Sequence, residues 1–248
     1  MSDAIRSELL KLRTTRTFLG IVIATLAFVA LITGAQAAAD TFDEGAIPGI
    51  DLLDVAGLAQ PFALVLGLLA VSTEFRHGTI TPTLLATPDR RRLMIAKVSA
   101  HVGAGVILGV VAYALAAVLM AVILPIRDIS TGITLGEGLE QVAGGIVCIA
   151  LLAAIGVGVG AVVRNQVGAV IGGLAWMFMI EPLLTVIPTV GGWIEDYGPG
   201  GAITAVTNSS FGGGADISQL AGGLLLLGYA VLLAIAGAAL LRRRDISA

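Results

Sequence analysis

The chain has 248 residues, of which 57% are hydrophobic and only 12% are charged, and its mean hydropathy is +0.99. Soluble domains carry about twice that share of charge, so the composition excludes a soluble globular protein and indicates an integral membrane protein. The net charge of −3 is less informative than its distribution, because the charges are segregated by side, and no nucleic-acid partner is expected. Cys148 is the only cysteine, and the two histidines lie 24 residues apart, so neither an intrachain disulfide nor a metal-ligand cluster is expected.

Residues 1–17 predict an amphipathic helix that lies on the membrane surface. Ile5, Leu9 and Leu12 recur at spacings of four and three residues, which places them on one helix face. The charged residues, including Glu8 and Lys11, fall off this apolar stripe.

Six charge-poor stretches are long enough, or nearly so, to cross a bilayer core of about 30 Å, which takes about 20 helical residues. They are residues 18–39, 57–73, 98–126, 141–163, 167–188 and 217–241. The second is short, and we expect it to extend outward through Leu52, Leu53 and Val55. The expected fold class is all-α integral membrane, with one transmembrane domain over residues 1–248. A signal peptide is the alternative for the first span, because Ala37–Ala39 resembles a cleavage site, but its 22 apolar residues favour retention.

Basic and acidic residues are segregated by side. An even number of spans places both termini together, and 13 of the 14 basic residues then fall on the side of the termini, Arg127 being the exception. Positive charge collects in cytoplasmic loops, so the sequence predicts cytoplasmic N- and C-termini.

Glu181 is the clearest ionisable group within a span and is a candidate for a substrate path. Pro182 follows it and predicts a helix break there, so a water-exposed outer vestibule is the alternative. Residues 191–216 are rich in glycine but carry Trp193 and Tyr197, which favours short helices that dip back into the membrane over an ordered external loop.

Glycines recur four residues apart within spans, in the pairs Gly105 and Gly109, Gly156 and Gly160, and Gly168 and Gly172. Such pairs allow close helix packing, either within one bundle or across a dimer interface.

A polar, basic segment, Glu74–Arg92, separates spans two and three on the basic side. Thr81 is the expected N-cap of a short helix with Pro82 in its first turn. Thr87-Pro88 repeats the signal and is expected to start the helix of span three. The short helix is expected to expose Ile80, Leu84 and Leu85 towards the cytoplasm.

The run Glu74-Phe75-Arg76-His77-Gly78-Thr79, followed by Leu84-Leu85-Ala86-Thr87-Pro88 and Arg90–Arg92, resembles the cytoplasmic loop of ABC-2 type transporter permeases. With the basic N-terminal helix and six spans, the resemblance extends over the whole chain. It implies a coupling helix that docks on a separate ATP-hydrolysing subunit, with two ATPases and a second permease copy or paralogue in the working transporter. The residues implied in coupling and docking are Glu74, Phe75, Arg76, His77, Gly78, Thr79, Thr81, Leu84, Leu85 and Pro88.

The chain lacks the sequence patterns of an enzyme. Its two lysines, Lys11 and Lys97, follow Leu10 and Ala96, so there is no Walker A loop, and neither H-E-x-x-H nor G-x-S-x-G occurs. We therefore expect no cofactor in this chain, with ATP and Mg on the partner ATPase, and membrane lipids as surroundings. The expected function is the permease subunit of a bacterial ABC exporter in the cell membrane, moving a hydrophobic or amphipathic compound such as a drug, lipid or peptide. The alternatives are a stand-alone secondary transporter or channel, which needs paired broken helices, and an intramembrane enzyme, which needs a catalytic pair.

Overall fold

The computed structural model describes residues 2–39, 47–208 and 215–243, and these are almost entirely helical. Six helical runs are long and apolar enough to cross a membrane. They are Arg16–Ala38, Pro48–Arg76, Arg90–Ile126, Leu135–Val163, Gln166–Thr185 and Gln219–Arg242. The all-α membrane fold with six spans is confirmed. The second span begins at Pro48 and therefore includes Leu52, Leu53 and Val55, as predicted.

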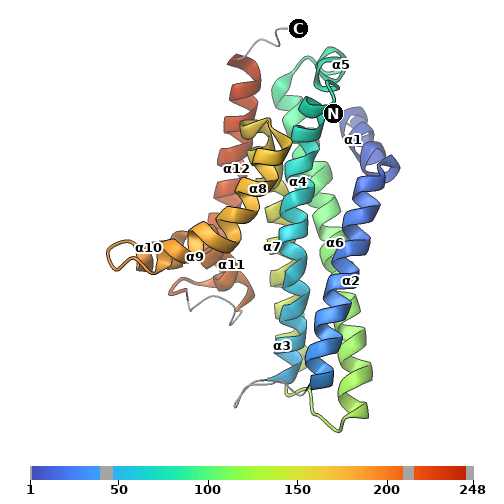
Figure 1. Ribbon diagram of the computed structural model, residues 1–248, viewed down its shortest axis with the longest axis vertical. Coiled ribbons are helices and arrows are strands. Elements are labelled where there is room, and N and C mark those ends of the chain that lie inside the picture. The colour runs from blue at the N-terminus through green and yellow to red at the C-terminus, as the bar shows by residue number, and fades with distance from the viewer. Residues whose placement is uncertain (1, 40–46, 209–214, 244–248) are drawn as a thin grey trace.

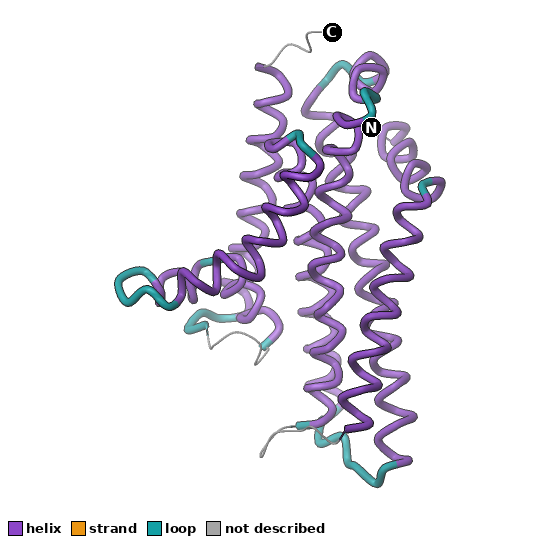
Figure 2. Tube along the Cα trace, in the orientation of Figure 1, coloured by secondary structure: helices purple, strands orange, loops and turns teal. Residues whose placement is uncertain are grey.

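The elements follow one another with short connections (Figure 2). The first half of the chain consists of α1 (Ser2–Thr14), α2 (Arg16–Ala39), α3 (Pro48–Asp54), a 3-10 turn η1 (Val55–Leu58), α4 (Ala59–Arg76), α5 (Ile80–Ala86) and α6 (Arg90–Ile126). The second half consists of α7 (Leu135–Val163), α8 (Gln166–Ala175), a π-helical turn η2 (Trp176–Ile180), α9 (Glu181–Thr185), α10 (Gly191–Tyr197), α11 (Pro199–Thr207) and α12 (Gln219–Arg243).

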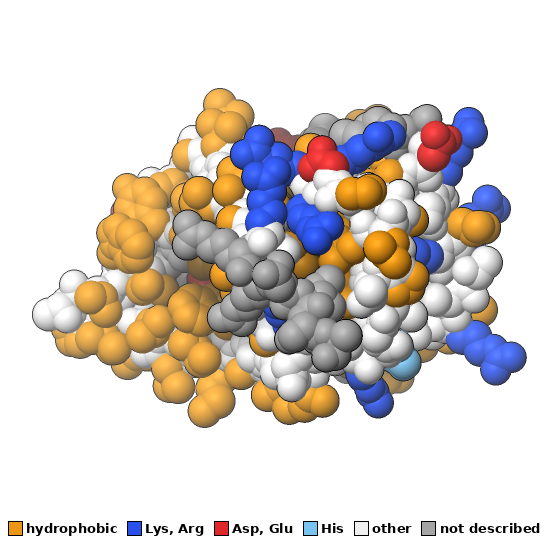
Figure 3. Space-filling model, turned by 90° about the horizontal axis from the view of Figure 1, so that it is seen from above, with side chains coloured by type: hydrophobic (Ala, Val, Ile, Leu, Met, Phe, Trp, Pro, Cys, Tyr) orange, Lys and Arg blue, Asp and Glu red, His pale blue; other side chains and the backbone are white. Residues whose placement is uncertain are grey.

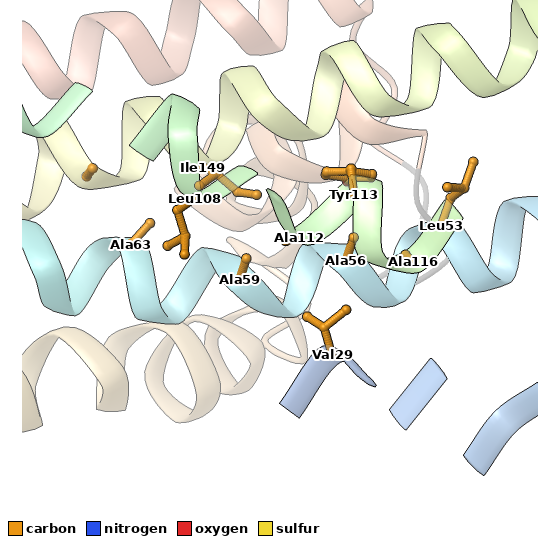
Figure 4. Packing of buried hydrophobic residues seen from close by; sticks show 11 residues of the cluster. Val29, Leu53, Ala56, Ala59, Ala63, Leu108, Ala112, Tyr113, Ala116 and Ile149 are labelled. Atoms are coloured by element: carbon orange, nitrogen blue, oxygen red, sulfur yellow. The ribbon is translucent and has the colours of Figure 1, made fainter. Parts of the chain in front are cut away.

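Helix α7 is the centre of the bundle and packs against α4, α6 and α12 (Figure 1). Helix α2 lies against α6 and α4. Small alanines and a few larger side chains fill the space between these helices (Figure 4). The buried cluster consists of Val29, Leu53, Ala56, Ala59, Ala63, Leu108, Ala112, Tyr113, Ala116, Ile149 and Ala153. Lipid tails are as apolar as these side chains, so close packing rather than escape from water holds the helices together.

Glycines bring the backbones of α4 and α7 into direct contact. A Cβ atom on Gly67 would collide with the carbonyl oxygen of Ala153, and one on Gly156 would collide with that of Leu64. Packing within the bundle is thus the role of the pairs in spans three and four. In span five, by contrast, a Cβ atom on Gly172 would meet nothing within 4 Å.

Residues 176–207, which we call the side arm, leave the bundle sideways at about the level of its middle (Figure 1). The short helices expected after residue 191 are present as α10 and α11, whereas residues 209–214 lie outside the described part. The expected helix break at Glu181 is wrong. Its N–H bonds to the carbonyl of Trp176, five residues back, and this wider turn accommodates Pro182, which lacks an N–H.

We predict that Gly156→Ala lowers the free energy of unfolding by about 1–3 kcal/mol, because overpacking forces α4 and α7 apart. Gly172→Ala is the matched control, since its methyl group meets no neighbour and gains helix propensity. Thermal unfolding of both variants in one detergent checks this. Equal unfolding temperatures for the two variants contradict the packing described for α4 and α7.

Candidate functional site

One end of the bundle, which we call the basic end, carries α1, the start of α2, the end of α4, α5, the start of α6, the α7–α8 turn and the end of α12 (Figure 1). Among the described residues, every lysine and arginine except Arg127 belongs to an element at this end. Figure 3 looks onto it and shows Lys and Arg side chains spread over the face, while the projecting side is mainly hydrophobic. The segregation of basic residues predicted from the sequence is therefore present in three dimensions.

Helix α5 follows α4 after a tight turn at the basic end. Gly78 has φ of +69°, a left-handed conformation that glycine adopts without steric cost. The helix begins at Ile80, with no side-chain cap, so Thr81 as N-cap and Pro82 as the first residue were placed too late in the chain.

The start of span three also differs from the prediction. Asp89, not Thr87, caps α6, and its carboxylate accepts hydrogen bonds from the N–H groups of Arg91 and Arg92 at 2.9 and 3.4 Å. A carboxylate at the N-terminus also meets the positive end of the helix dipole. Pro88 lies in the connection between α5 and α6.

Only one of the three apolar side chains of α5 is available to a partner. Ile80 and Leu84 are buried with Leu93 of α6, beside Phe75 of α4. Their expected exposure is wrong, because residues four apart share one helix face and that face packs inward. Leu85 is 77% exposed.

Four charged residues join α1, α4 and α6 directly beneath α5. Lys97 Nζ lies 2.7 Å from Glu74 Oε1 and 3.1 Å from Glu8 Oε2. Lys11 Nζ lies 2.8 Å from Glu74 Oε1 and 2.7 Å from Glu8 Oε1. The two lysines of the chain therefore bridge the same two carboxylates, and we call these four residues the ion network.

The ion network is largely withdrawn from solvent. The side chains of Lys97, Glu8 and Glu74 are 2%, 5% and 10% exposed, and that of Lys11 is 41% exposed. Lys97 Nζ also donates to the carbonyl oxygen of Ala70 at 3.2 Å, so each of its three N–H groups has an acceptor. Paired in this way, the charges offset the cost of their burial.

The pKa values of the α1 members follow from this pairing. Burial works to raise the pKa of Glu8, but the charges of Lys97 and Lys11 and their hydrogen bonds outweigh it and hold that pKa below its ordinary value. Burial works to lower the pKa of Lys11, but hydrogen bonds and charge from Glu74 and Glu8 raise it. Both groups are thus held in their charged forms.

Further contacts tie the end of α4 to the second half of the chain. Arg76 donates to the side chain of Gln166 at 3.1 Å. Arg164 donates to the carbonyl oxygen of Leu240 at 2.6 Å and lies over the ring of Phe75, 5.1 Å from its centroid. His77 is exposed, with Nδ1 3.0 Å from the carbonyl oxygen of Thr73, and Thr79 precedes α5 in the turn.

Glu181 lies far from the ion network, in the side arm. Its side chain accepts hydrogen bonds from Trp176 Nε1 at 3.0 Å and from the N–H of Gly200, in the first turn of α11, at 2.5 Å. Glu181 is 6% exposed and borders a cavity of about 1290 Å³ between the side arm and helices α2, α4 and α7.

We predict that Lys97→Met destabilises the protein by about 3–5 kcal/mol, because it removes the buried counter-charge and leaves two buried carboxylates with only the partly solvated Lys11. Lys11→Met is the control and costs less, since Lys11 is partly solvated and exposed pairs contribute at most about 1 kcal/mol. Adding Glu74→Gln to Lys97→Met restores part of the loss. Unfolding of Lys97→Met at the wild-type temperature contradicts a structural role for the ion network.

The pKa directions predict how stability depends on pH. Because the pKa of folded Glu8 lies below its ordinary 4.5, its contribution is present above pH 4.5 and is lost as the pH falls through the lower value. Because the pKa of folded Lys11 lies above its ordinary 10.5, its contribution is present below pH 10.5 and is lost as the pH rises through the higher value. Unfolding temperatures measured from about pH 3 to about pH 7 should fall at the acid end less steeply in Glu8→Gln than in wild type or Glu140→Gln. The same acid dependence in wild type and both variants contradicts a lowered pKa of Glu8 in the folded protein.

A family model described as "ABC-2 family transporter protein" matches residues 4–186, which include the whole ion network, α5 and Glu181. No curated protein matches the chain. The match covers well over half of the chain and agrees with the six-span helical fold. The chain therefore belongs to the ABC-2 family of transporter proteins, as a membrane transport component that is not itself catalytic.

Proposed function

We propose that the chain is the permease subunit of a bacterial ABC exporter and that a separate ATP-hydrolysing subunit docks on α5 and drives it. The observation that carries this proposal is the attachment of α5. One face of this short helix is buried against α4 and α6, while Leu85 on the other face is 77% exposed at the basic end.

The attachment gives α5 a mechanical role. Seven residues are too few to form a stable helix alone, so contacts with Phe75 and Leu93 hold its shape. The ion network ties α4 and α6 together immediately below. A push on α5 would therefore reach spans two and three as one unit and tilt them against the rest of the bundle.

The surface around Leu85 fits a protein partner. A hollow of about 250 Å³ lies between α1 and α5, lined by Ala4, Ser7, Glu8, Lys11, Pro82, Thr83, Ala86, Thr87 and Leu93. An exposed leucine next to this hollow gives a partner both an apolar contact and a depression to fill. One ATPase on each of two permease copies would complete the transporter.

The positive-inside rule supports the orientation that this proposal needs. Lysine and arginine are enriched in loops that face the cytoplasm, so the basic end, with α1, α5 and the end of α12, belongs on the side where ATP is found. The cell membrane of a bacterium is the expected location.

The cavity beside Glu181 is the proposed cargo path. Its lining is mainly apolar, which favours a hydrophobic or amphipathic compound such as a drug, lipid or peptide. A second permease copy or paralogue would close the path, as the family resemblance implies.

A stand-alone secondary transporter is the second candidate. The 3-10 turn η1 in span two and the π-turn η2 in span five both border the cavity, and paired irregularities mark the sites of such transporters. Neither turn interrupts its span, however, which favours the first proposal. Export that continues without ATP or any ATPase would reverse this preference.

We predict that Leu85→Asp abolishes co-purification of the ATPase and ATP-dependent export but leaves the unfolding temperature unchanged, because Leu85 is exposed. Leu135→Asp is the matched control: Leu135 is 80% exposed at the other end of the bundle, so ATPase binding should persist. Retention of both ATPase binding and export in Leu85→Asp contradicts the docking surface.

Leu84→Asp should behave differently from Leu85→Asp, because Leu84 is 5% exposed and an unpaired carboxylate there would be buried. We expect loss of folded protein or a lower unfolding temperature. A stable Leu84→Asp protein that fails only in ATPase binding would assign the docking face to Leu84 instead.

A further inference from the structure

We propose that the cavity beside Glu181 binds an amphipathic cation, a compound whose positive charge is delocalised and surrounded by apolar groups. This inference rests on the proposed function, because it names the class of cargo for the path. It follows from the size of the cavity, the sign of its charges and the polar groups that face it.

The cavity is large enough for a drug-sized or larger molecule. Its volume of about 1290 Å³ exceeds the roughly 300–1000 Å³ of ordinary small-molecule sites. Helices α2, α4 and α7 form one wall and the side arm forms the other. Most lining side chains are apolar, so a ligand must carry substantial apolar surface.

All the formal charges in the lining are negative. Asp54, Glu181 and Glu195 border the cavity, and no lysine, arginine or histidine does so among the described residues. Asp54 and Glu181 are 9% and 6% exposed. Carboxylates this deep in an apolar bundle gain most from a nearby positive charge, since little water screens them.

The carboxylates are held in place rather than free to turn away. Trp176 and Gly200 each donate a hydrogen bond to Glu181, and the side-chain amide of Gln141 donates to Asp54. The two donors to Glu181 are uncharged, so they orient its carboxylate without neutralising it, which leaves the charge of Glu181 available to a ligand.

A buried amide and several aromatic rings complete the lining. Gln60 is 8% exposed and borders the cavity. Its side-chain amide can both donate and accept a hydrogen bond, so it can bond to an occupant. The rings of Phe28, Tyr113, Trp176 and Phe178 also border the cavity, and aromatic faces attract cations.

The same features select among ligand classes. An anion would face carboxylates with no basic side chain in the described lining to receive it, and a neutral compound would leave Glu181 without a counter-charge. A compact ammonium ion gives up strong hydration on burial. A large cation with spread charge loses less, and its apolar groups match the walls.

The test compares two ions of nearly the same shape and opposite charge, tetraphenylphosphonium and tetraphenylborate. The full-length chain carries two tryptophans, and Trp193 does not border the cavity. In a Trp193→Phe chain, Trp176 is the only tryptophan, so its fluorescence reports the cavity. The protein is placed in phosphatidylcholine nanodiscs, with empty discs to measure partition of each ion into lipid.

We expect the phosphonium to quench Trp176 fluorescence in a saturable way. Its affinity should be at least about tenfold higher than that of the borate, because charges a few ångströms apart interact strongly in a partly screened site. Glu181→Gln should weaken phosphonium binding about tenfold, and Gln60→Glu, which adds a carboxylate, should strengthen it. Glu140→Gln, an exposed residue outside the cavity, should leave it unchanged.

Equal or stronger binding of the borate overturns the inference, as does an absence of saturable phosphonium binding. Gln60→Glu keeps the test decisive if Glu181→Gln fails to fold, because unchanged affinity in Gln60→Glu also overturns it. None of these outcomes involves an ATPase, so they leave the proposed docking on α5 untouched. Conversely, loss of that docking function would leave a measured preference for cations standing.

Discussion

Pairing of charge in an apolar bundle is the constraint on which the basic end depends. A lone lysine or glutamate inside such a bundle is costly, and Lys97, Glu74 and Glu8 are all nearly buried. The structure pairs them: each carboxylate meets both lysines, and the two lysines come from different helices. As a result, α1, α4 and α6 are held together beside the point where α5 is attached, and the surface helix becomes part of the transmembrane bundle rather than a loose loop.

A second constraint acts deeper in the bundle. Glycines at 67, 156 and 160 bring α4 and α7 together until backbone meets backbone, and α7 in turn packs on α6 and α12. This close packing contrasts with the side arm, which stands away from α2 and α4 and leaves the cavity between them. The molecule thus combines a tight unit, to which α5 is fastened, with an arm that borders open space. Tilting of the unit against the arm is the motion that would change the cavity.

The sequence predicted the large features because they depend on local composition. Span length and hydropathy identified six helices. The sequence could not predict contacts between distant residues. Glu8 reads as a solvent-facing charge on an amphipathic helix, and its partner Lys97 lies 89 residues away. Leu84 and Leu85 are identical neighbouring residues, so the sequence does not distinguish them. Leu84 is buried because Phe75 and Leu93 pack against it. Two local predictions were wrong because a neighbouring group took the expected role. Asp89 caps α6 in place of Thr87, and a π-turn accommodates Pro182 without a helix break.

In the proposed function energy enters through α5, and the most direct test identifies which molecule contacts position 85 in the cell. A photo-crosslinking amino acid at position 85, with position 135 at the opposite end of the bundle as control, captures the neighbour covalently, and mass spectrometry identifies it. The account predicts an adduct at position 85 that contains a subunit with a Walker A sequence, and none at position 135. Adducts at position 85 with lipid alone, or the same ATPase captured equally at both positions, would contradict it.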